Sequence, residues 1–296
     1  MNRSISIIII TYNRPADCLE LLKDISLLNY IQEALTDVIV INNASTVDYS
    51  DIKTFIEQNP HLPFRYKDAP SNLGVARGRN YAAGFAQGDL LVFVDDDVLL
   101  TDKDILPKII ASFDKKLSPD REVGAVSFKV LYHSNGEMQV TAFPHKQFNK
   151  YKDKSEFLTS YYVGCAHAIK KQVWLQAGDY PEDFFYGMEE YDLSYRILDA
   201  GYAIQYEASV VILHKESPLG RKPVAEKLKM QWVNKSKVAW RYLPKRYFYT
   251  TALLWSFEYL KKAGFRKGLY FSAWREIARI PGLKNAALFL TVPCLI

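Results

Sequence analysis

Short apolar runs alternate with amphipathic stretches in the first third of the chain, and this alternation constrains the fold more than any other feature. The apolar runs cover residues 6–11, 38–41 and 90–94, and segments with helical spacing lie between them. Strands that are apolar throughout are typical of parallel sheets covered by helices on both faces. A polar cluster follows each run, at the carboxyl end where open α/β sheets bind ligands. We therefore predict an α/β sheet with a ligand site at that edge.

The second part of the chain is less regular. Strands are predicted at residues 123–131, 158–169 and 203–213, a helix at residues 191–200, and a polar loop at residues 132–154. Pro218 and Gly220 then break the pattern, and the remainder is helical, basic and rich in aromatic residues. We predict a boundary near residue 218, with an α/β domain at residues 1–218 and a helical extension at residues 219–296.

Charge is distributed unevenly over the 296 residues, whose formal net charge is +5. Residues 1–219 carry 22 Lys and Arg against 30 Asp and Glu, whereas residues 220–296 carry 16 against 3. An asymmetry of this size usually reports a partner. Basic and aromatic residues are interleaved in the extension, and an apolar run at residues 286–296 closes the chain. This composition predicts helices on an anionic membrane surface.

The alternative for the extension is that its aromatic side chains pack on the first domain. Nucleic acid is not predicted as a partner, because no nucleic-acid-binding motif accompanies the basic residues.

Three scattered cysteines, Cys18, Cys165 and Cys294, have the spacing of neither a disulfide framework nor a zinc site. A reducing compartment fits this pattern best. The first apolar run is too short for a signal peptide, and no uninterrupted run reaches the roughly 18 residues of a spanning helix. We expect a cytoplasmic protein, either free or peripheral on the inner face of the plasma membrane.

Asp95, Asp96 and Asp97 directly follow the apolar run at residues 90–94. Three adjacent carboxylates repel one another unless a cation or solvent compensates. Mg²⁺ and Mn²⁺ bind one or two carboxylates together with substrate phosphates, and side chains two residues apart in an extended segment face the same side. The triplet therefore predicts a metal site, the alternative being a solvated loop after an edge strand.

Three further segments place polar side chains after apolar runs. Residues 72–80 form a glycine turn with Arg77 and Arg79, which either faces phosphates or simply begins a helix. Glu190 lies in an acidic cluster at the start of a predicted helix, where a carboxylate can act as a general base or only favour the helix dipole. His214 follows a predicted strand and is either a metal ligand or structural.

In order and spacing these segments resemble the family 2 glycosyltransferases, which are inverting enzymes of GT-A fold. The resemblance covers roughly residues 4–217 and rests on five motifs. The motifs are Ser6-Ile-Ile-Ile-Ile-Thr-Tyr-Asn-Arg14, Val40-Ile-Asn-Asn-Ala-Ser45, Asn72-Leu-Gly74, Phe93-Val-Asp-Asp-Asp97 and Met188-Glu-Glu-Tyr-Asp-Leu-Ser-Tyr-Arg196. The resemblance implies transfer of a hexosyl or deoxyhexosyl group from a nucleoside diphosphate sugar to an acceptor hydroxyl.

The resemblance also implies roles for single residues. Glu190 would be the catalytic base, and Asp97 with His214 would hold Mg²⁺ or Mn²⁺. The donor nucleotide would lie against a larger set, namely Thr11, Tyr12, Arg14, Asn42, Asn72, Gly74, Arg77, Asp95 and Asp96. Asn42 departs from the family, which usually has Asp there. Its amide oxygen can still accept a hydrogen bond but the charge is gone, so the base preference stays open.

Two features bear on the acceptor and on closure of the site. The basic extension suggests a lipid-linked glycan acceptor, as in bacterial surface polysaccharide assembly. Pro218 and Gly220 suggest a loop that closes over the donor, with Lys215 or Arg221 on its diphosphate.

Two rival functions fit the same residues less well. A sugar-nucleotide pyrophosphorylase should have a glycine-rich loop with Arg and Lys after the first strand, where this chain has Thr11-Tyr-Asn-Arg-Pro15. An inactive nucleotide-sugar-binding scaffold is disfavoured by the presence of both Asp97 and Glu190.

Overall fold

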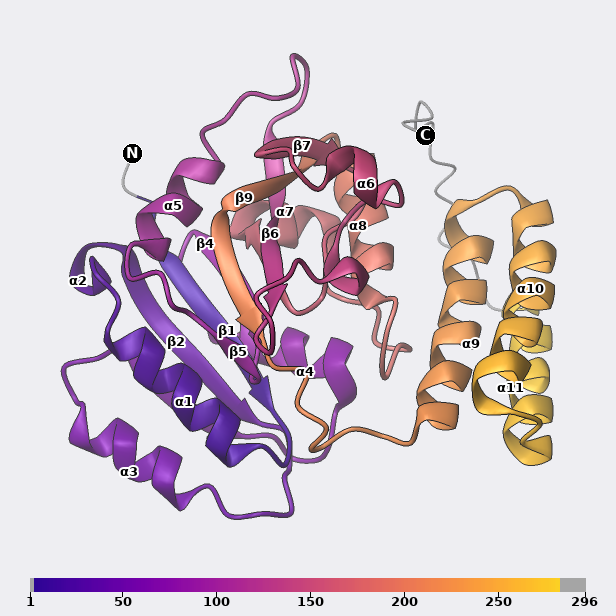
Figure 1. Ribbon diagram of the computed structural model, residues 1–296, viewed down its shortest axis with the longest axis horizontal. Coiled ribbons are helices and arrows are strands. Elements are labelled where there is room, and N and C mark those ends of the chain that lie inside the picture. The colour runs from indigo at the N-terminus through magenta and orange to yellow at the C-terminus, as the bar shows by residue number, and fades with distance from the viewer. Residues whose placement is uncertain (1–2, 283–296) are drawn as a thin grey trace.

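One mixed sheet organises the molecule, which is seen here in a computed structural model that describes residues 3–282. Its strand order is β3-β2-β1-β4-β8-β6-β9-β5, and β7 pairs with β9 (Figure 1). The strands are β1 (Ile5–Thr11), β2 (Leu35–Asn42), β3 (Phe64–Asp68), β4 (Leu90–Asp95), β5 (Val98–Leu99), β6 (Val123–Tyr132), β7 (Glu156–Thr159), β8 (Ala166–Lys170) and β9 (Ala203–His214). Strands β3, β2, β1 and β4 pair in parallel, whereas β8 runs antiparallel to both of its neighbours.

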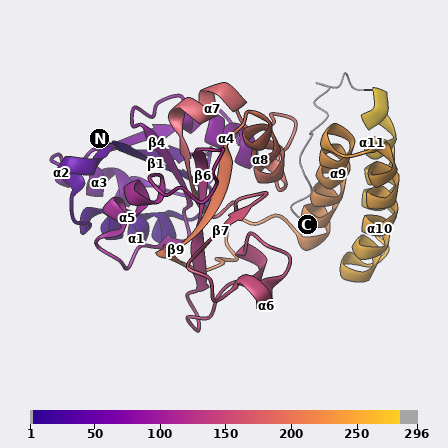
Figure 2. The same ribbon diagram turned by 90° about the horizontal axis from the view of Figure 1, so that it is seen from above.

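Helices cover both faces of the sheet, as the two views show (Figures 1 and 2). Helices α1, α3 and α5 share one apolar cluster with the sheet, and α4, α7 and α8 share another on the opposite face. The helices are α1 (Pro15–Ser26), α2 (Ile31–Ala34), α3 (Ser50–Gln58), α4 (Gly74–Ala83), α5 (Ile105–Ser112), α6 (Phe148–Tyr151), α7 (Lys171–Ala177), α8 (Glu189–Asp199), α9 (Val224–Tyr242), α10 (Lys245–Ala263) and α11 (Lys267–Arg279), with short 3-10 turns η1 (Val140–Ala142) and η2 (Ile280–Gly282).

Strand β1 shows why the layers form. Ile7 and Ile9 pack into the cluster with α1, while Ile8 packs into the cluster with α4, because successive side chains of a strand point to opposite faces. Helix α1 begins with Pro15 at its first turn and buries Leu22 and other apolar residues at helical spacing. Full burial of a side chain of this size contributes about 1.5–3 kcal/mol, so the sheet is fixed from both sides.

The predicted strands and helices are largely confirmed, with one correction. The single strand predicted at residues 158–169 is wrong: the chain forms β7 and β8, which pair with different neighbours. Their connection, residues 160–165, carries the largely buried side chains of Tyr162 and Val163 but forms no strand and turns at Gly164. Helices α2, α5 and α7 and the short strand β5 were not predicted, and the segment predicted as a polar loop at residues 132–154 contains the short elements η1 and α6.

The helical extension is both a packing element and an exposed surface. Helices α9, α10 and α11 share a core of their own. Helix α9 also contacts the sheet domain, because Arg241 pairs with Asp192 at 2.8 Å and Asn234 donates to the carbonyl of Gly187 at 2.9 Å. The boundary near residue 218 stays a prediction.

Within residues 3–282, the helices are too short or too polar to cross a membrane. Cys18 and Cys165 are free and buried. Cys294 and the apolar run at residues 286–296 lie outside the described residues.

Candidate functional site

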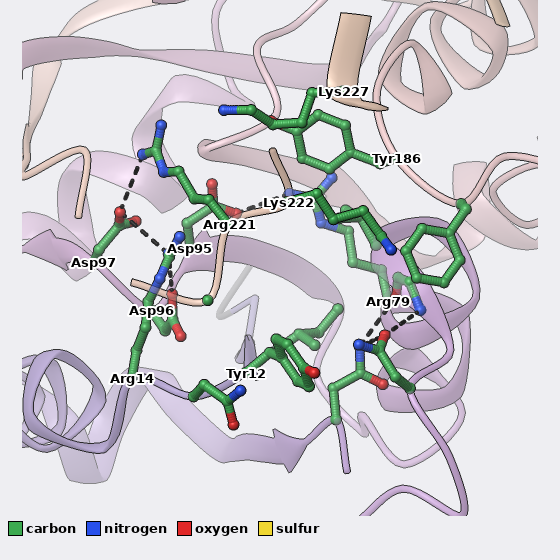
Figure 3. Close-up of a pocket in the computed structure, with 18 of the residues that line it drawn as sticks. Tyr12, Arg14, Arg79, Asp95, Asp96, Asp97, Tyr186, Arg221, Lys222 and Lys227 are labelled. Carbon is green, nitrogen blue, oxygen red and sulfur yellow. Dashed lines mark hydrogen bonds and ion pairs between the residues drawn. The ribbon is translucent and has the colours of Figure 1, made fainter. Parts of the chain in front are cut away.

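A cavity of about 700 Å³ opens at the carboxyl ends of β1 and β4 (Figure 3). Its walls also include the start of α4, the segment after β9 and the first turn of α9. Most of the residues predicted to touch the donor or a metal line it, namely Tyr12, Arg14, Asn72, Gly74, Asp95, Asp96, Asp97 and His214. The sheet edge predicted from the apolar runs is therefore where the polar side chains gather.

Three residues predicted for donor binding lie outside the cavity lining. Thr11 is fully buried and shares a hydrogen bond with Tyr49 at 2.7 Å. Asn42 donates to Asp68 at 2.9 Å and accepts from the backbone of Ser45 at 3.0 Å. Arg77 is exposed and donates to the carbonyl of Leu73.

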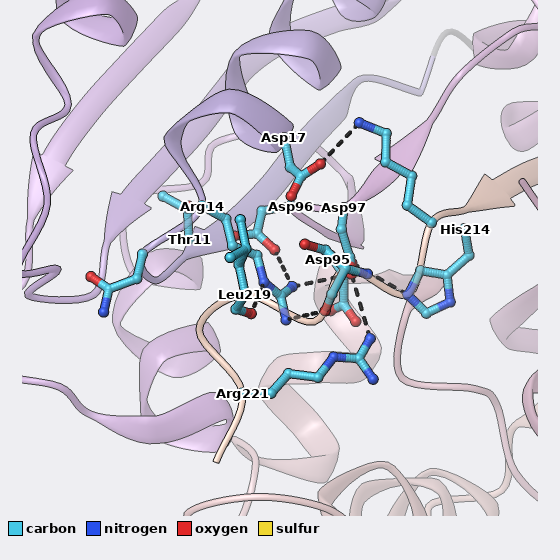
Figure 4. Close-up of polar contacts among 12 residues, drawn as sticks. Thr11, Arg14, Asp17, Asp95, Asp96, Asp97, His214, Leu219 and Arg221 are labelled. Carbon is cyan, nitrogen blue, oxygen red and sulfur yellow. Dashed lines mark hydrogen bonds and ion pairs between the residues drawn. The ribbon is translucent and has the colours of Figure 1, made fainter. Parts of the chain in front are cut away.

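Asp95, Asp97 and His214 converge on one point beside the cavity (Figure 4). One ligand atom from each lies within 4.8 Å of the others, and the Nε2 of His214 is 3.3 Å from Oδ1 of Asp97. That Oδ1 is buried and has no hydrogen-bond partner, a costly arrangement that a bound cation would relieve. Two carboxylates and an imidazole suit Mg²⁺ or Mn²⁺, so the residues fit the predicted metal.

The pKa values of Asp97 and His214 also favour a cation at this point. Burial raises the pKa of Asp97, but the imidazole of His214 at 3.3 Å and the guanidinium of Arg14 lower it by more, so its net pKa falls below the usual range. Burial lowers the pKa of His214, and its contacts with Asp97 and Cys165 raise it on balance. The site therefore favours a positive charge beside Asp97, which a divalent cation could supply in place of a proton.

Gln139 is a member of the site that the sequence did not reveal. Its side chain is buried, and its Oε1 lies 2.9 Å from Nδ1 of His214. When the imidazole is neutral, a hydrogen on Nδ1 donated to this oxygen leaves the lone pair of Nε2 free for a cation beside Asp97. Gln139 comes from the segment predicted as a polar loop, where no motif marks it.

Gln139→Leu is expected to weaken Mn²⁺ binding by about 10- to 100-fold, the usual effect of removing a hydrogen-bond partner of a ligating histidine. The effect arises because the imidazole loses the acceptor that fixes its orientation. Mn²⁺ titration followed by electron paramagnetic resonance measures it. An unchanged Mn²⁺ affinity would show that Gln139 does not orient a metal ligand.

Arg14 joins the acidic triplet to the segment after β9. Its Nη1 lies 2.8 Å from Asp96 and 3.2 Å from Asp97, and its Nε donates to the carbonyl of Leu219 at 2.6 Å (Figure 4). Gly220 has φ of +65°, and a Cβ at this position would lie 2.2 Å from the carbonyl oxygen of Tyr12. Only glycine allows so close an approach at that φ, so this segment closes tightly on the end of β1.

Cations line the side of the cavity opposite the sheet. Arg221, Lys222 and Lys227 all border it, and Nη2 of Arg221 lies 3.6 Å from Asp97 (Figure 3). Lys215 instead pairs with Asp17 at 3.0 Å and does not line the cavity. Positive side chains facing a candidate cation site suit a ligand with several negative charges, such as a diphosphate.

Arg79 forms a partition between this cavity and a smaller one of about 260 Å³. Its buried guanidinium contacts Asp95 at 3.0 Å and Glu189 at 3.2 Å, and it donates to the carbonyl of Gly164 at 2.8 Å. Arg79 lines the larger cavity and Gly164 lines the smaller one. The sequence suggested phosphate contact for this arginine, whereas its guanidinium is engaged by protein groups.

Glu190 lines the smaller cavity, in the first turn of α8. Burial and the neighbouring charge of Glu189 raise its pKa to about 8. A carboxylate with a raised pKa in a cavity is suited to take up a proton near neutral pH. The predicted base and the predicted metal ligands therefore lie in two different cavities, with Arg79 between them.

Comparison with known proteins gives one family and a consistent fold. The model of the family described as glycosyl transferase family 2 matches residues 6–173. An uncharacterized protein of Haemophilus influenzae is 30% identical over 178 residues, which are 60% of this chain and 92% of that protein.

Two solved structures illustrate the similarity of fold. The mannosyltransferase PcManGT from Pyrobaculum calidifontis, solved in complex with GDP-Man and Mn²⁺, has a TM-score of 0.64 at 21% identity, over 96% of this chain and 77% of that one. TarS of S. aureus (residues 1–349), solved in complex with UDP-GlcNAc, has a TM-score of 0.61 at 13% identity, over 94% of this chain and 81% of that one. At these identities the likeness establishes the fold alone.

Proposed function

This chain belongs to glycosyl transferase family 2 and has the GT-A fold, and we propose that it moves a sugar from a nucleoside diphosphate sugar to an acceptor hydroxyl with inversion at the anomeric carbon. The observation that carries the proposal is the pairing of two sites across Arg79. Asp95, Asp97 and His214 gather on one side, and Glu190 lies on the other.

The larger cavity is the proposed donor site. Tyr12 and Asn72 would lie beside the nucleoside, and the diphosphate would meet Arg221 and Lys222. Asp97 and His214, with Asp95 at the rim, would hold Mg²⁺ or Mn²⁺. The bound cation would neutralise charge that develops on the departing nucleoside diphosphate. The related mannosyltransferase was solved with a nucleotide sugar and Mn²⁺ together, which supports this proposal.

Glu190 is the proposed base, in preference to its neighbour Glu189. Glu189 is buried, and its carboxylate forms an ion pair with Arg79. Glu190 opens into the smaller cavity and has a pKa raised to about 8. There it would accept the proton of the attacking hydroxyl as the new glycosidic bond forms. A single displacement of this kind inverts the anomeric configuration.

A donor screen tests the proposal directly. The purified chain is incubated with UDP-, GDP- and dTDP-sugars in Mn²⁺ or Mg²⁺, and the released nucleoside diphosphate is measured. We expect metal-dependent release from at least one donor. Metal-dependent cleavage of any of them would dismiss an inactive scaffold, whereas donors that stay intact and unbound in both metals would contradict the proposal.

We further propose that the enzyme works on a lipid-linked glycan at the cytoplasmic face of an anionic membrane. The support is the outward face of α10, where Leu253, Leu254 and Phe257 are 52–65% exposed. Lys245 and Lys261 lie near its two ends, and its one carboxylate, Glu258, is paired with Lys262. An apolar face with basic ends is typical of a helix at an anionic interface, where each basic residue contributes about 1 kcal/mol.

Leu253→Glu combined with Phe257→Glu is expected to lower binding to phosphatidylglycerol vesicles at least about tenfold. Each apolar side chain contributes about 1.5–3 kcal/mol when it leaves water, and 1.4 kcal/mol is a factor of ten in affinity. Flotation of the full chain measures the effect. Leu175→Glu is the matched control, because Leu175 is 72% exposed on α7. Equal flotation of the wild type and the double variant would contradict a role for this face.

A further inference from the structure

The smaller cavity has a chemistry of its own beyond the presence of Glu190. It is lined by three segments, residues 140–148, residues 161–164 and the start of α8. Aromatic rings form much of its wall, and the rings of Tyr161 and Tyr191 stack with centroids 4.4 Å apart and planes at 21°. Pockets with aromatic walls and a few polar groups are typical binding sites for small organic ligands. The cavity is large enough for a monosaccharide unit.

Two lysines lie at or near this cavity. Lys146 lines it from the loop before α6, and Lys235 of α9 lies against one of its wall residues. The ammonium of Lys235 lies 5.9 Å from the ring centroid of Tyr191, which is in the cavity wall, and 4.4 Å from that of Trp255. In the described part of the chain, neither lysine has a carboxylate within ion-pair distance.

The charges around Lys235 show how these groups face one another. Burial lowers the pKa of Lys235, the ammonium groups of Lys146 and Lys262 lower it further, and the carboxylate of Glu190 raises it. Lys146 and Lys235 therefore lie near the one carboxylate of the cavity wall, Glu190, while Lys262 is paired with Glu258. Like charges that are partly removed from water repel one another, and an anion placed between them would relieve that repulsion.

The α6 segment adds more positive charge near His145. Burial and the charges of Lys150 and Lys154 lower the pKa of His145, another residue of the cavity wall. Within the described chain, those lysines lie over the ring of Tyr151 rather than against a carboxylate. The potential on this side of the cavity is therefore positive, which favours an anionic ligand over a neutral one.

We propose that the smaller cavity selects an acceptor sugar that carries a negative charge, either a phosphate or a carboxylate, next to the hydroxyl that is glycosylated. The sugar ring lies among the aromatic residues, the hydroxyl faces Glu190, and the anionic group lies between Lys146 and Lys235. The inference rests on the proposed function, because it identifies the acceptor class of that reaction. A sugar phosphate joined to a lipid and a uronic acid within a glycan are the two sources of such a charge.

Binding of matched sugar pairs tests the inference. Each neutral methyl glycoside of glucose, galactose and mannose is compared with its methyl uronide and with the corresponding sugar 1-phosphate, by saturation-transfer NMR on the full chain with UDP and Mn²⁺. We expect the charged member of at least one pair to bind about tenfold more tightly, as a charge-assisted hydrogen bond allows. If only the uronides are preferred, the anionic group of the acceptor is a carboxylate. If only the 1-phosphates are preferred, it is a phosphate.

Substitutions then locate the charge. Lys146→Gln and Lys235→Gln are each expected to remove most of the preference and to leave affinity for the neutral sugar and for UDP unchanged. Lys146 is exposed, so its substitution does not threaten folding, and Lys23→Gln on α1 is the control for net charge. If no charged sugar is preferred, or if both substitutions leave the preference intact, the inference is wrong. Metal-dependent release of nucleoside diphosphate in the donor screen would show in that case that the proposed function itself still holds.

Discussion

Glu190→Gln is expected to lower kcat for glycosyl transfer by about 10²–10⁴-fold, the range that a positioned general base contributes. The amide keeps the size of the side chain but cannot accept the proton of the acceptor hydroxyl. Donor affinity should stay close to that of the wild type, because Glu190 lines the smaller cavity and not the larger one. Glu182→Gln is the matched control, since this exposed carboxylate lies eight residues earlier in the chain.

The pH profile distinguishes a base from a structural carboxylate. A base acts in its ionised form, and burial with the neighbouring Glu189 raises the pKa of Glu190 to about 8. The kcat/KM of the wild type should therefore fall as the pH drops below about 8, and this acid limb should be absent from the residual activity of Glu190→Gln. Turnover retained in the variant with the same acid limb would remove Glu190 as the base.

Asp97→Asn is expected to lower transfer by at least about 10²-fold and to weaken Mn²⁺ binding. The Lewis-acid effect of a catalytic metal is worth several kcal/mol, and 1.36 kcal/mol is a factor of ten in rate. The carboxylate of Asp97 is central to the group, because His214, Arg14 and the backbone of Ser217 all meet it. Donor binding measured by calorimetry should also weaken in the variant. Adding EDTA to the wild type should lower its transfer rate and donor affinity in the same way.

The matched control for this substitution is Asp120→Asn, at an exposed carboxylate without an ion-pair partner in the described chain. It should leave metal and donor affinities unchanged. Donor binding that is indifferent both to EDTA and to Asp97→Asn would mean that no metal acts at this site.

The fold was predictable where one segment carries its own signal. Strands β1, β2 and β4 each contain a run of consecutive apolar residues, and the burial of these runs on both faces is what such runs indicate. The same signal produced the wrong prediction of one strand at residues 158–169. The apolar run continues through Tyr162 and Val163, but these buried side chains belong to the connection between β7 and β8. Helix α7 has only seven residues and follows β8 directly, so no loop signal marks its start.

The site was predictable in its residue types but not in its partners. The acidic triplet and Glu190 lie at the ends of recognisable elements, so their neighbourhood follows from the sheet. The contact of Gln139 with His214 joins residues 75 apart in the chain, and that of Arg79 with Glu189 joins residues 110 apart. Such pairs depend on how loops pack across the sheet, and a single sequence carries no periodic signal for them.

The partition formed by Arg79 also has a consequence for how this enzyme could diversify. In the described chain, the two cavities have no lining residue in common. If the two cavities have their proposed roles, substitutions in residues 140–148 would change the acceptor range without disturbing the nucleotide side. One donor specificity could then be inherited by a series of enzymes that build different linkages, each differing from the next by a few side chains in that loop.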